Sequence, residues 1–319
     1  MTGAIFGETG KVTEGLYHVD LNQYGMKRLC SAFVLKTSKC LLILDTGTSD
    51  DVRALVRFIK RNGWDPANIT FIVPTHFHFD HFGGGWKLWK KIMKFNPSVK
   101  ILTTRETMEH LQDASLHLKR ARRTFGDFVG EMIPLPENAY EIVETDTPLD
   151  IPGLEDGESF SLVSTPGHVP DHVCPTMNRN GENVFCFTGE AAGTLFHSRK
   201  LVTFGTSMPP DFTFKEYMES LEKIIALEPT NAGYCHFGTV MGKENVTKVL
   251  EENRQFSIFF KDYVKREFEK SGSVRTVVEK FAAEEAPGRT DLPRADLLVN
   301  ILVALVYGQL VDLGLKQPK

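Results

Sequence analysis

The feature that most constrains the fold of this chain is one short stretch with four metal-ligand side chains, His76, His78, Asp80 and His81. It directly follows an apolar run at 69–73 that is typical of a buried strand. His76 and His78 are two residues apart, so in an extended segment their imidazoles project to the same side. Imidazole nitrogens offered together with a carboxylate suit zinc, iron or manganese. The stretch therefore predicts a metal site at the end of a strand.

Strand-like and helix-like segments alternate around this stretch. Residues 11–20, 31–36 and 40–45 have strand patterns, and 51–60 has the periodicity of an amphipathic helix. This alternation predicts an α/β layered domain. The chain has 319 residues, 41% of them hydrophobic and 24% charged, which is ordinary for a globular protein. A net charge of -4 offers no general attraction to nucleic acid or to anionic membranes.

Three more ligand-type residues each come just after a predicted strand. The strands are predicted at 160–165, 183–188 and 232–235, and the residues that follow them are His168, Glu190 and His236. A rigid sheet edge can hold a ligand that is presented from such a loop. Each residue alone is typical of an ordinary loop, but together with the first cluster they indicate one metal centre.

The segment at about 86–160 reads as a largely helical insertion. A helix predicted over 106–128 carries His110, His117 and the basic run Lys119–Arg123. A basic run on a helix is usually a solvated face, although it could also bind a phosphate or a nucleic acid. We expect His110 and His117 to be surface or packing residues rather than ligands.

The last part of the chain is predicted to contain helices and no strands, at 243–270, 273–285 and 293–314. The final helix is apolar nearly all round, but polar residues interrupt and bound it, and a membrane span needs about 20 mostly uninterrupted apolar residues. We therefore expect a buried or homodimer-forming helix and no membrane insertion. Five scattered cysteines, and a start without a basic and then apolar leader, favour a cytoplasmic protein.

The order of these motifs resembles the metallo-β-lactamase superfamily. The resemblance covers residues 12 to about 240 and includes the segment Leu44-Asp45-Thr46-Gly47, and it is nearest to the glyoxalase II-like and lactonase-like hydrolases. It implies an αββα four-layer sandwich, with an α-helical C-terminal extension beyond the shared region. The corresponding division is a domain over 1–242, which includes the insertion at about 86–160, and an extension over 243–319.

The resemblance also implies two divalent metal ions, zinc first, with iron or manganese as alternatives. It places His76, His78 and His168 on one metal, with Asp80, His81 and His236 on the other. Glu190 would bridge the two, in a position that is usually aspartate in the family. Asp45 would orient a ligand without binding metal.

The expected activity is hydrolysis of an ester, thioester, lactone or phosphodiester of a small molecule, with Asp80 as the catalytic proton carrier. One alternative is a mononuclear iron enzyme like the persulfide dioxygenases of the same superfamily. Another is a non-catalytic metal-binding regulatory protein. A nucleic-acid substrate is disfavoured by the net acidity. Tyr24, Phe79 and Phe82, with parts of 105–160, are candidates for the pocket lining.

Overall fold

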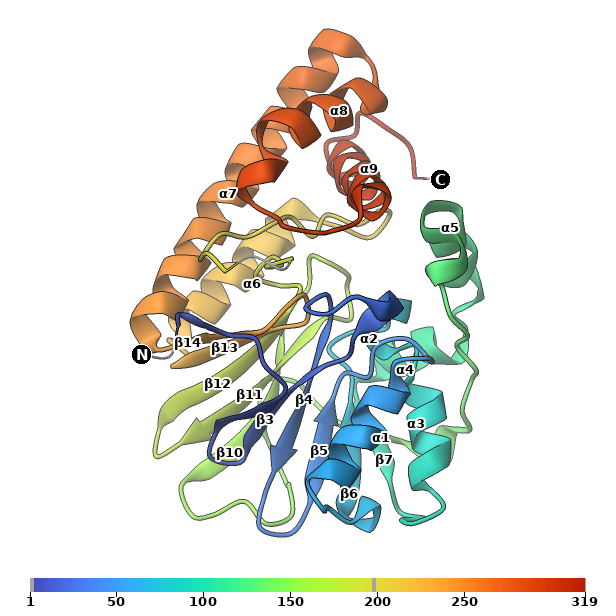
Figure 1. Cartoon of the computed structure of the whole chain (residues 1–319), viewed down its shortest axis with the longest axis vertical. Coiled ribbons are helices and arrows are strands. Elements are labelled where there is room, and N and C mark those ends of the chain that lie inside the picture. Colours follow the sequence, from blue (N-terminus) through green and yellow to red (C-terminus); the bar gives the residue numbers. More distant parts are fainter. Residues whose placement is uncertain (1–2, 197–198, 319) are drawn as a thin grey trace.

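The computed structural model describes residues 3–196 and 199–318, and within these ranges the strands form two seven-stranded sheets (Figure 1). The first sheet is ordered β2 (Gly10–Thr13), β3 (Leu16–Asp20), β4 (Ser31–Lys36), β5 (Leu41–Leu44), β6 (Ile69–Val73), β7 (Lys100–Thr103) and β8 (Tyr140–Ile142). The second is ordered β1 (Ile5–Phe6), β14 (Thr239–Met241), β13 (Asn231–Tyr234), β12 (Glu182–Gly189), β11 (Val173–Arg179), β10 (Glu158–Ser164) and β9 (Pro148–Leu149).

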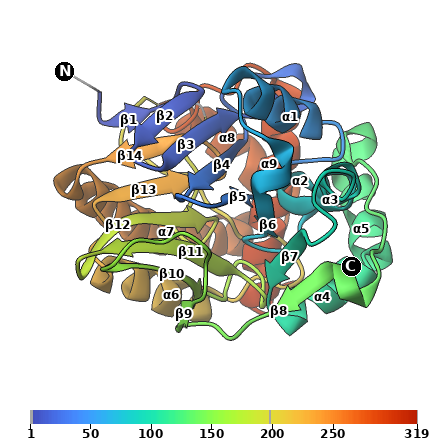
Figure 2. The same ribbon diagram turned by 90° about the horizontal axis from the view of Figure 1, so that it is seen from below.

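The two sheets pack face to face because the central strands carry apolar side chains on both faces, one toward the other sheet and one toward the outer helices. In β5, Leu42 and Leu44 point between the sheets, whereas Leu41 and Ile43 point to the outer face. Phe187 of β12 reaches the same inter-sheet core from the other side and is fully buried. Figure 2 shows the two sheets side by side when the molecule is viewed from below.

Amphipathic helices cover the outer face of each sheet. The first sheet is covered by α1 (Val52–Arg61), α3 (Gly85–Ile92) and α4 (Arg105–Gln112). The second is covered by α6 (Phe214–Ala226) and the N-terminal part of α7 (Lys243–Ser271). The stripe on α1 is typical, since Val52, Leu55 and Ile59 all lie in the buried core below it. These four layers confirm the predicted αββα sandwich.

Three predicted segments differ in detail from the structure. Residues 11–20 form a hairpin of β2 and β3, because Gly15 turns the chain with a φ of 71°. The helix predicted over 106–128 is broken at 113–114 into α4 and α5 (Ser115–Phe125). The segment at 86–160 contributes β7, β8 and β9 to the sheets as well as its helices.

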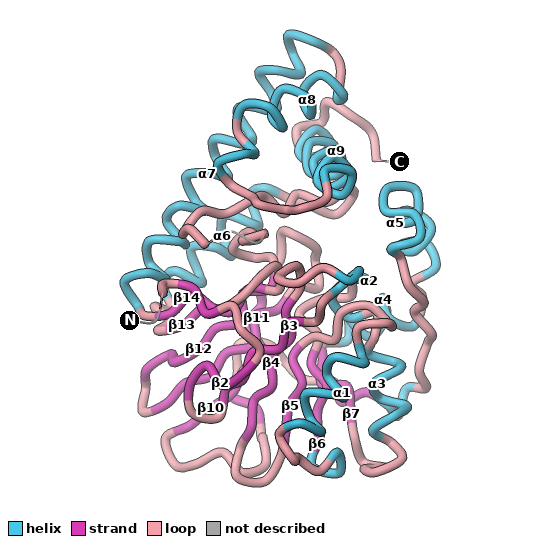
Figure 3. The backbone as a smooth tube through the Cα atoms, in the orientation of Figure 1, coloured by secondary structure: helices cyan, strands magenta, loops and turns pink. Residues whose placement is uncertain are grey.

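The C-terminal helices form a cap above the upper edge of both sheets, as Figures 1 and 3 show. Its core is made by the second half of α7, by α8 (Val274–Glu284) and by α9 (Ala295–Asp312), with fully buried Phe281 and Leu305. Within the described residues, α9 is the one helix long and apolar enough to cross a membrane, with a mean hydropathy of 1.6. Half of that helix is buried inside the protein, as in the core helix of a globular domain.

Candidate metal centre

The first ligand cluster lies where β6 ends and the short helix α2 (Phe79–Phe82) begins. His76 lies in the connecting segment, His78 is the residue before the helix, and the helix itself carries Asp80 and His81. The rings of His76 and His78 meet edge to face with their centroids 4.7 Å apart. The two imidazoles therefore reach one place, as their spacing predicts.

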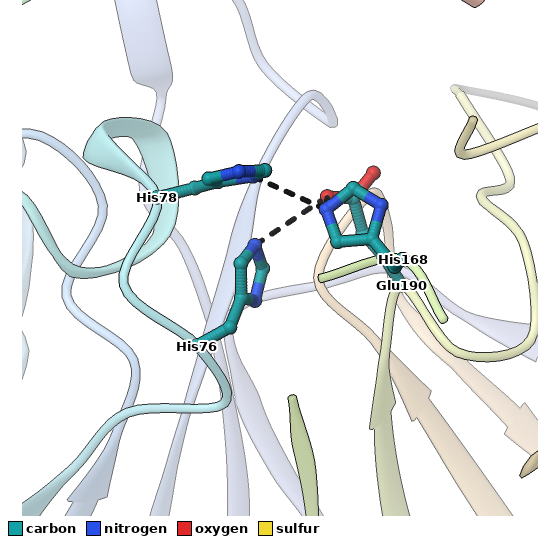
Figure 4. Close-up of side chains that lie close together, drawn as sticks. All are labelled: His76, His78, His168 and Glu190. Carbon is teal, nitrogen blue, oxygen red and sulfur yellow. Dashed lines mark hydrogen bonds and ion pairs between the residues drawn. The ribbon is translucent and has the colours of Figure 1, made fainter. Parts of the chain in front are cut away.

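The three later residues come to the same place from the second sheet. His168 follows β10, Glu190 directly follows β12, and His236 lies two residues beyond β13. The upper ends of these strands meet the loops of the first sheet, and the carboxylate of Glu190 lies among His76, His78 and His168 (Figure 4). The structure thus brings together all seven residues that the sequence proposes as ligands.

The first group of donor atoms surrounds one carboxylate oxygen. Oε2 of Glu190 lies 2.7 Å from Nε2 of His168 and 3.6 Å from Nε2 of His76. Nδ1 of His78 lies 3.1 Å from Nε2 of His168. Two ligands of one tetrahedral zinc, each bound at about 2.1 Å, are about 3.4 Å apart. The spacing of this group is therefore close to that of ligands sharing one ion.

The second group has the same spacing and shares an atom with the first. Nε2 of His81 lies 3.4 Å from Oδ2 of Asp80 and 3.4 Å from Oε2 of Glu190. Nε2 of His236 lies 3.6 Å from Oδ2 of Asp80. Because the same oxygen of Glu190 faces His81 and the first group, the longer glutamate side chain occupies the position between them.

The ring nitrogens show that these residues fit metal ions. Nε2 of His76 and both ring nitrogens of His81 are buried without a hydrogen-bond partner among the described residues. A buried polar atom without a partner is costly, and a bound cation would satisfy the nitrogen atoms that face the cluster. The other nitrogen of His168 and of His236 is held by a backbone carbonyl, that of Thr206 at 2.6 Å and that of Leu29 at 3.0 Å. Outer hydrogen bonds of this kind orient metal-binding histidines.

Asp45 supports His76 through Thr75, which is the supporting role expected from sequence. Its carboxylate accepts hydrogen bonds from the backbone N–H and from the hydroxyl of Thr75, at 2.8 and 2.9 Å. Because the hydroxyl gives its only proton to Asp45, it must accept from Nδ1–H of His76, 3.0 Å away. His76 is then unprotonated at Nε2, the nitrogen that faces the cluster. Burial raises the pKa of Asp45 to about 7.

The electrostatics of most of the site suit metal binding, whereas burial of His81 is outweighed by Asp80, which raises the pKa of this ring, so that His81 must lose a proton when it binds a metal. Burial, helped by the neighbouring histidines, lowers the pKa of His76 well below its usual value, which favours the neutral imidazole that binds metal. Burial alone would raise the pKa of Glu190, but His168 and His81 outweigh it and hold that pKa low. Burial likewise opposes ionisation of Asp80, and His81 and His236 outweigh it and lower its pKa. Both carboxylates are therefore available as ligands.

Two neighbours of the cluster were not predicted. The ring of His172 stacks on His76 with centroids 5.2 Å apart, and its Nε2 accepts the backbone N–H of Glu190 at 3.1 Å. His172 comes only four residues after His168, and this clustering of histidines in the sequence was a signal that could have identified it. Cys235 lies with His81 and His236 in a second group of possible ligand atoms. Its position immediately before His236 was the available hint.

The cluster forms the floor of a cavity of about 680 Å³ between the sheets and the helical cap. The walls are mostly apolar and come from the loop at 208–211, from α5 and from α9, including Phe125, Met208, Leu297, Ile301 and Ala304. Tyr24 and Phe79 line the cavity as expected. The prediction for Phe82 is wrong, because its side chain turns down into the core below the first sheet and is 2% exposed.

The basic run of α5 is divided between two environments. Arg120 and Arg123 line the cavity, whereas Lys119 and Arg122 are exposed and are not part of its lining. The run is therefore partly a solvated face, as expected for a charged helix, and partly a wall of the cavity.

Two facing mixed sheets with outer helices, and a histidine and carboxylate cluster at the strand ends, define a protein of the metallo-β-lactamase fold. The family model described as the metallo-beta-lactamase superfamily matches residues 25–236. The chain belongs to the metallo-beta-lactamase superfamily, whose known members typically bind metal ions and include hydrolases such as lactonases and β-lactamases.

Individual relatives agree with this membership. A metallo-beta-lactamase fold-containing protein of Sulfurisphaera tokodaii is 26% identical over 247 residues, which cover 75% of this chain and 82% of the relative. An N-acyl homoserine lactonase of a Bacillus species is 30% identical over 210 residues, covering 66% of this chain and 70% of the relative. A metallo-beta-lactamase family protein of Thermus thermophilus has a similar solved structure, with a TM-score of 0.60, 15% identity and 95% of each chain covered.

Proposed function

We propose that this protein is a metal-dependent hydrolase that cleaves an ester, thioester or lactone carrying an apolar acyl group. The observation that carries the proposal is the position of Glu190, whose single oxygen Oε2 lies within 3.6 Å of nitrogens from both ligand groups. A shared carboxylate oxygen favours two metal ions, zinc first, with iron or manganese as alternatives. It disfavours the one-iron dioxygenase, which needs only the first group.

Divalent ions held by these residues would supply a Lewis acid and a hydroxide at neutral pH. His76, His78 and His168 would hold one ion, Asp80, His81 and His236 the other, and Glu190 both. The side chain of Asp80 is 22% exposed and lines the cavity, which puts its carboxylate between the histidines and an incoming substrate. Asp80 is therefore positioned to orient the attacking water and to move its proton to the leaving group.

The apolar cavity walls favour an acyl compound over a phosphodiester. Leu297, Ile301 and Ala304 of α9 and Phe125 of α5 offer aliphatic and aromatic contacts to a hydrocarbon chain. Cavities of about 300–1,000 Å³ with mostly apolar walls are typical of small-molecule sites. The N-acyl homoserine lactonase of Bacillus is a relative whose name indicates a lactone with an acyl chain. We therefore include lactones of that kind among the substrates to test.

The test is metal analysis run beside a substrate panel. We expect about two metal ions per chain, no oxygen uptake, and turnover of at least one of N-decanoyl homoserine lactone, S-decanoyl-N-acetylcysteamine and p-nitrophenyl decanoate. His78→Ala and Asp80→Ala should each lower both metal content and turnover, whereas the exposed control Asp50→Ala should change neither. One iron per chain with oxygen consumption would instead establish the dioxygenase. Unchanged metal content and turnover in His78→Ala and Asp80→Ala would refute the ligand assignment.

A further inference from the structure

His117 is a cavity residue outside the proposed ligand set, and it packs directly on one of the ligands. Its ring is nearly parallel to that of His78, with an interplanar angle of 9° and centroids 4.8 Å apart. It also contacts the rings of Phe77, edge to face at 4.9 Å, and of Phe79, tilted at 5.8 Å. The helix that carries it, α5, is anchored by buried Leu118 and Ala121, which pack against Phe79. The ring of His117 is therefore held in one orientation beside the metal centre.

The tautomer of His117 follows from its hydrogen bond to the backbone. The N–H of Phe79 donates to Nε2 of His117 at 3.2 Å. A nitrogen that accepts a hydrogen bond carries no proton, so the proton of this imidazole must be on Nδ1. Among the described residues, no group forms a hydrogen bond with Nδ1 of His117. This atom is not fully buried, and the side chain lines the cavity. The Nδ1–H is therefore a donor open to the cavity.

We propose that Nδ1–H of His117 donates a hydrogen bond to the carbonyl oxygen of the substrate and stabilises the negative charge that develops there during attack. This inference rests on the proposed hydrolase function. The carbonyl carbon gains a bond to the oxygen of water and loses its bond to the leaving oxygen or sulfur, which takes up a proton. His117 keeps its own proton throughout. A fixed donor in an apolar cavity is effective because it needs no reorganisation when the charge appears.

A purely structural role would use only half of this side chain. The first N–H groups of α2 have no acceptor within the helix, and Nε2 of His117 accepts that of Phe79. Stacking on His78 needs only a flat ring. Neither contact requires a donor on Nδ1. A variant that keeps the stacking ring but has neither nitrogen can be compared with a variant that keeps both an acceptor for Phe79 and a donor to the cavity.

The experiment compares His117→Phe with His117→Gln in zinc-loaded protein. Phenylalanine keeps the stacking but loses both the Nδ1–H donor and the Nε2 acceptor of the Phe79 N–H, whereas the glutamine amide can accept from Phe79 and still donate to the cavity. With N-decanoyl homoserine lactone or another active member of the panel, we expect kcat of His117→Phe to fall about 100-fold with KM little changed. His117→Gln should recover at least a tenth of the wild-type kcat. Lys119→Gln, on the exposed side of the same helix, is the matched control and should be unaffected.

A second measurement does not depend on turnover. Two-bond ¹H–¹⁵N spectra of histidine-labelled protein should show His117 protonated at Nδ1, and this signal should be lost in His117→Phe. A proton on Nε2 would overturn the inference, and so would equal losses of kcat in the Phe and Gln variants at full metal content. A rise in KM alone would also overturn it, because the contact would then serve ground-state binding. Wild-type protein inactive on every acyl substrate would instead refute the proposed function, and the inference with it.

Discussion

Replacing Asp45 by asparagine should weaken metal binding without touching a metal ligand. Asp45 now accepts two hydrogen bonds from Thr75, and Thr75 in turn accepts from Nδ1–H of His76. An asparagine can accept the backbone N–H of Thr75 only with its carbonyl oxygen, so its NH₂ group must face the hydroxyl. The hydroxyl of Thr75 then accepts a hydrogen bond from this NH₂ group and donates its own proton to Nδ1 of His76. His76 is forced to carry its proton on Nε2, the nitrogen that faces Glu190.

The size of the effect follows from the type of contact that is lost. Removing an outer partner of a metal-binding histidine typically lowers metal affinity by about 10- to 100-fold. This corresponds to about 1.4–2.7 kcal/mol of binding free energy at 25 °C. The loss should be largest at the site built on His76, because the hydrogen-bond chain from Asp45 ends at Nδ1 of His76, whereas Asp45 acts on His81 and Asp80 only through its charge.

The assay is a competition titration of Zn²⁺ against a chelating dye at pH 8. This pH is chosen because burial raises the pKa of Asp45 to about 7, so the wild-type carboxylate is ionised there. Asp50→Asn is the matched control, since the side chain of Asp50 is 76% exposed. ¹⁵N spectra of the metal-free proteins should show the proton of His76 moving from Nδ1 to Nε2. An Asp45→Asn protein that binds zinc as tightly as the wild type, or keeps the Nδ1–H tautomer, would refute the reasoning.

Three further predictions concern stability. Burial lowers the pKa of His18 from 6.5 to about 4, so only the unfolded chain binds this proton between those values. His18 should therefore contribute about 2 kcal/mol to the unfolding free energy that the protein loses between pH 7 and pH 5, and urea titrations of His18→Gln should show a loss smaller by about that amount. In Gly308→Ala the new Cβ would collide with the carbonyl oxygen of Ser207, which should lower the free energy of unfolding by about 1–3 kcal/mol in denaturant titrations. Gly288→Ala is the matched control and should be neutral, because its Cβ would meet nothing within 4 Å. Zinc at 100 times its Kd should add about 2.7 kcal/mol to the free energy of unfolding, and chelation should lower Tm accordingly; equal melting curves with and without chelator would contradict a built metal site.

Local sequence was sufficient for the layers and for the ligand set. Short apolar runs such as that of 41–44 indicate strands buried on both faces, and they can be recognised without any knowledge of distant contacts. The histidine cluster after β6 and the later residues at strand ends were recognisable because each motif is short and contiguous. Whether these seven residues bind two metals remains a prediction. What the structure adds is that they lie within ligand-sharing distances.

Contacts between segments far apart in the chain depend on the tertiary structure. His117 looked like a packing residue on a surface helix, and only the docking of α5 beside α2 placed it on His78. The break between α4 and α5 carries no proline or glycine, and its one local signal is Asp113, whose side chain accepts the backbone N–H of Ser115. The length of Glu190 left its role open in sequence, because the reach of a side chain has meaning only once its partners are placed. The fold decided that one oxygen of this glutamate faces both ligand groups.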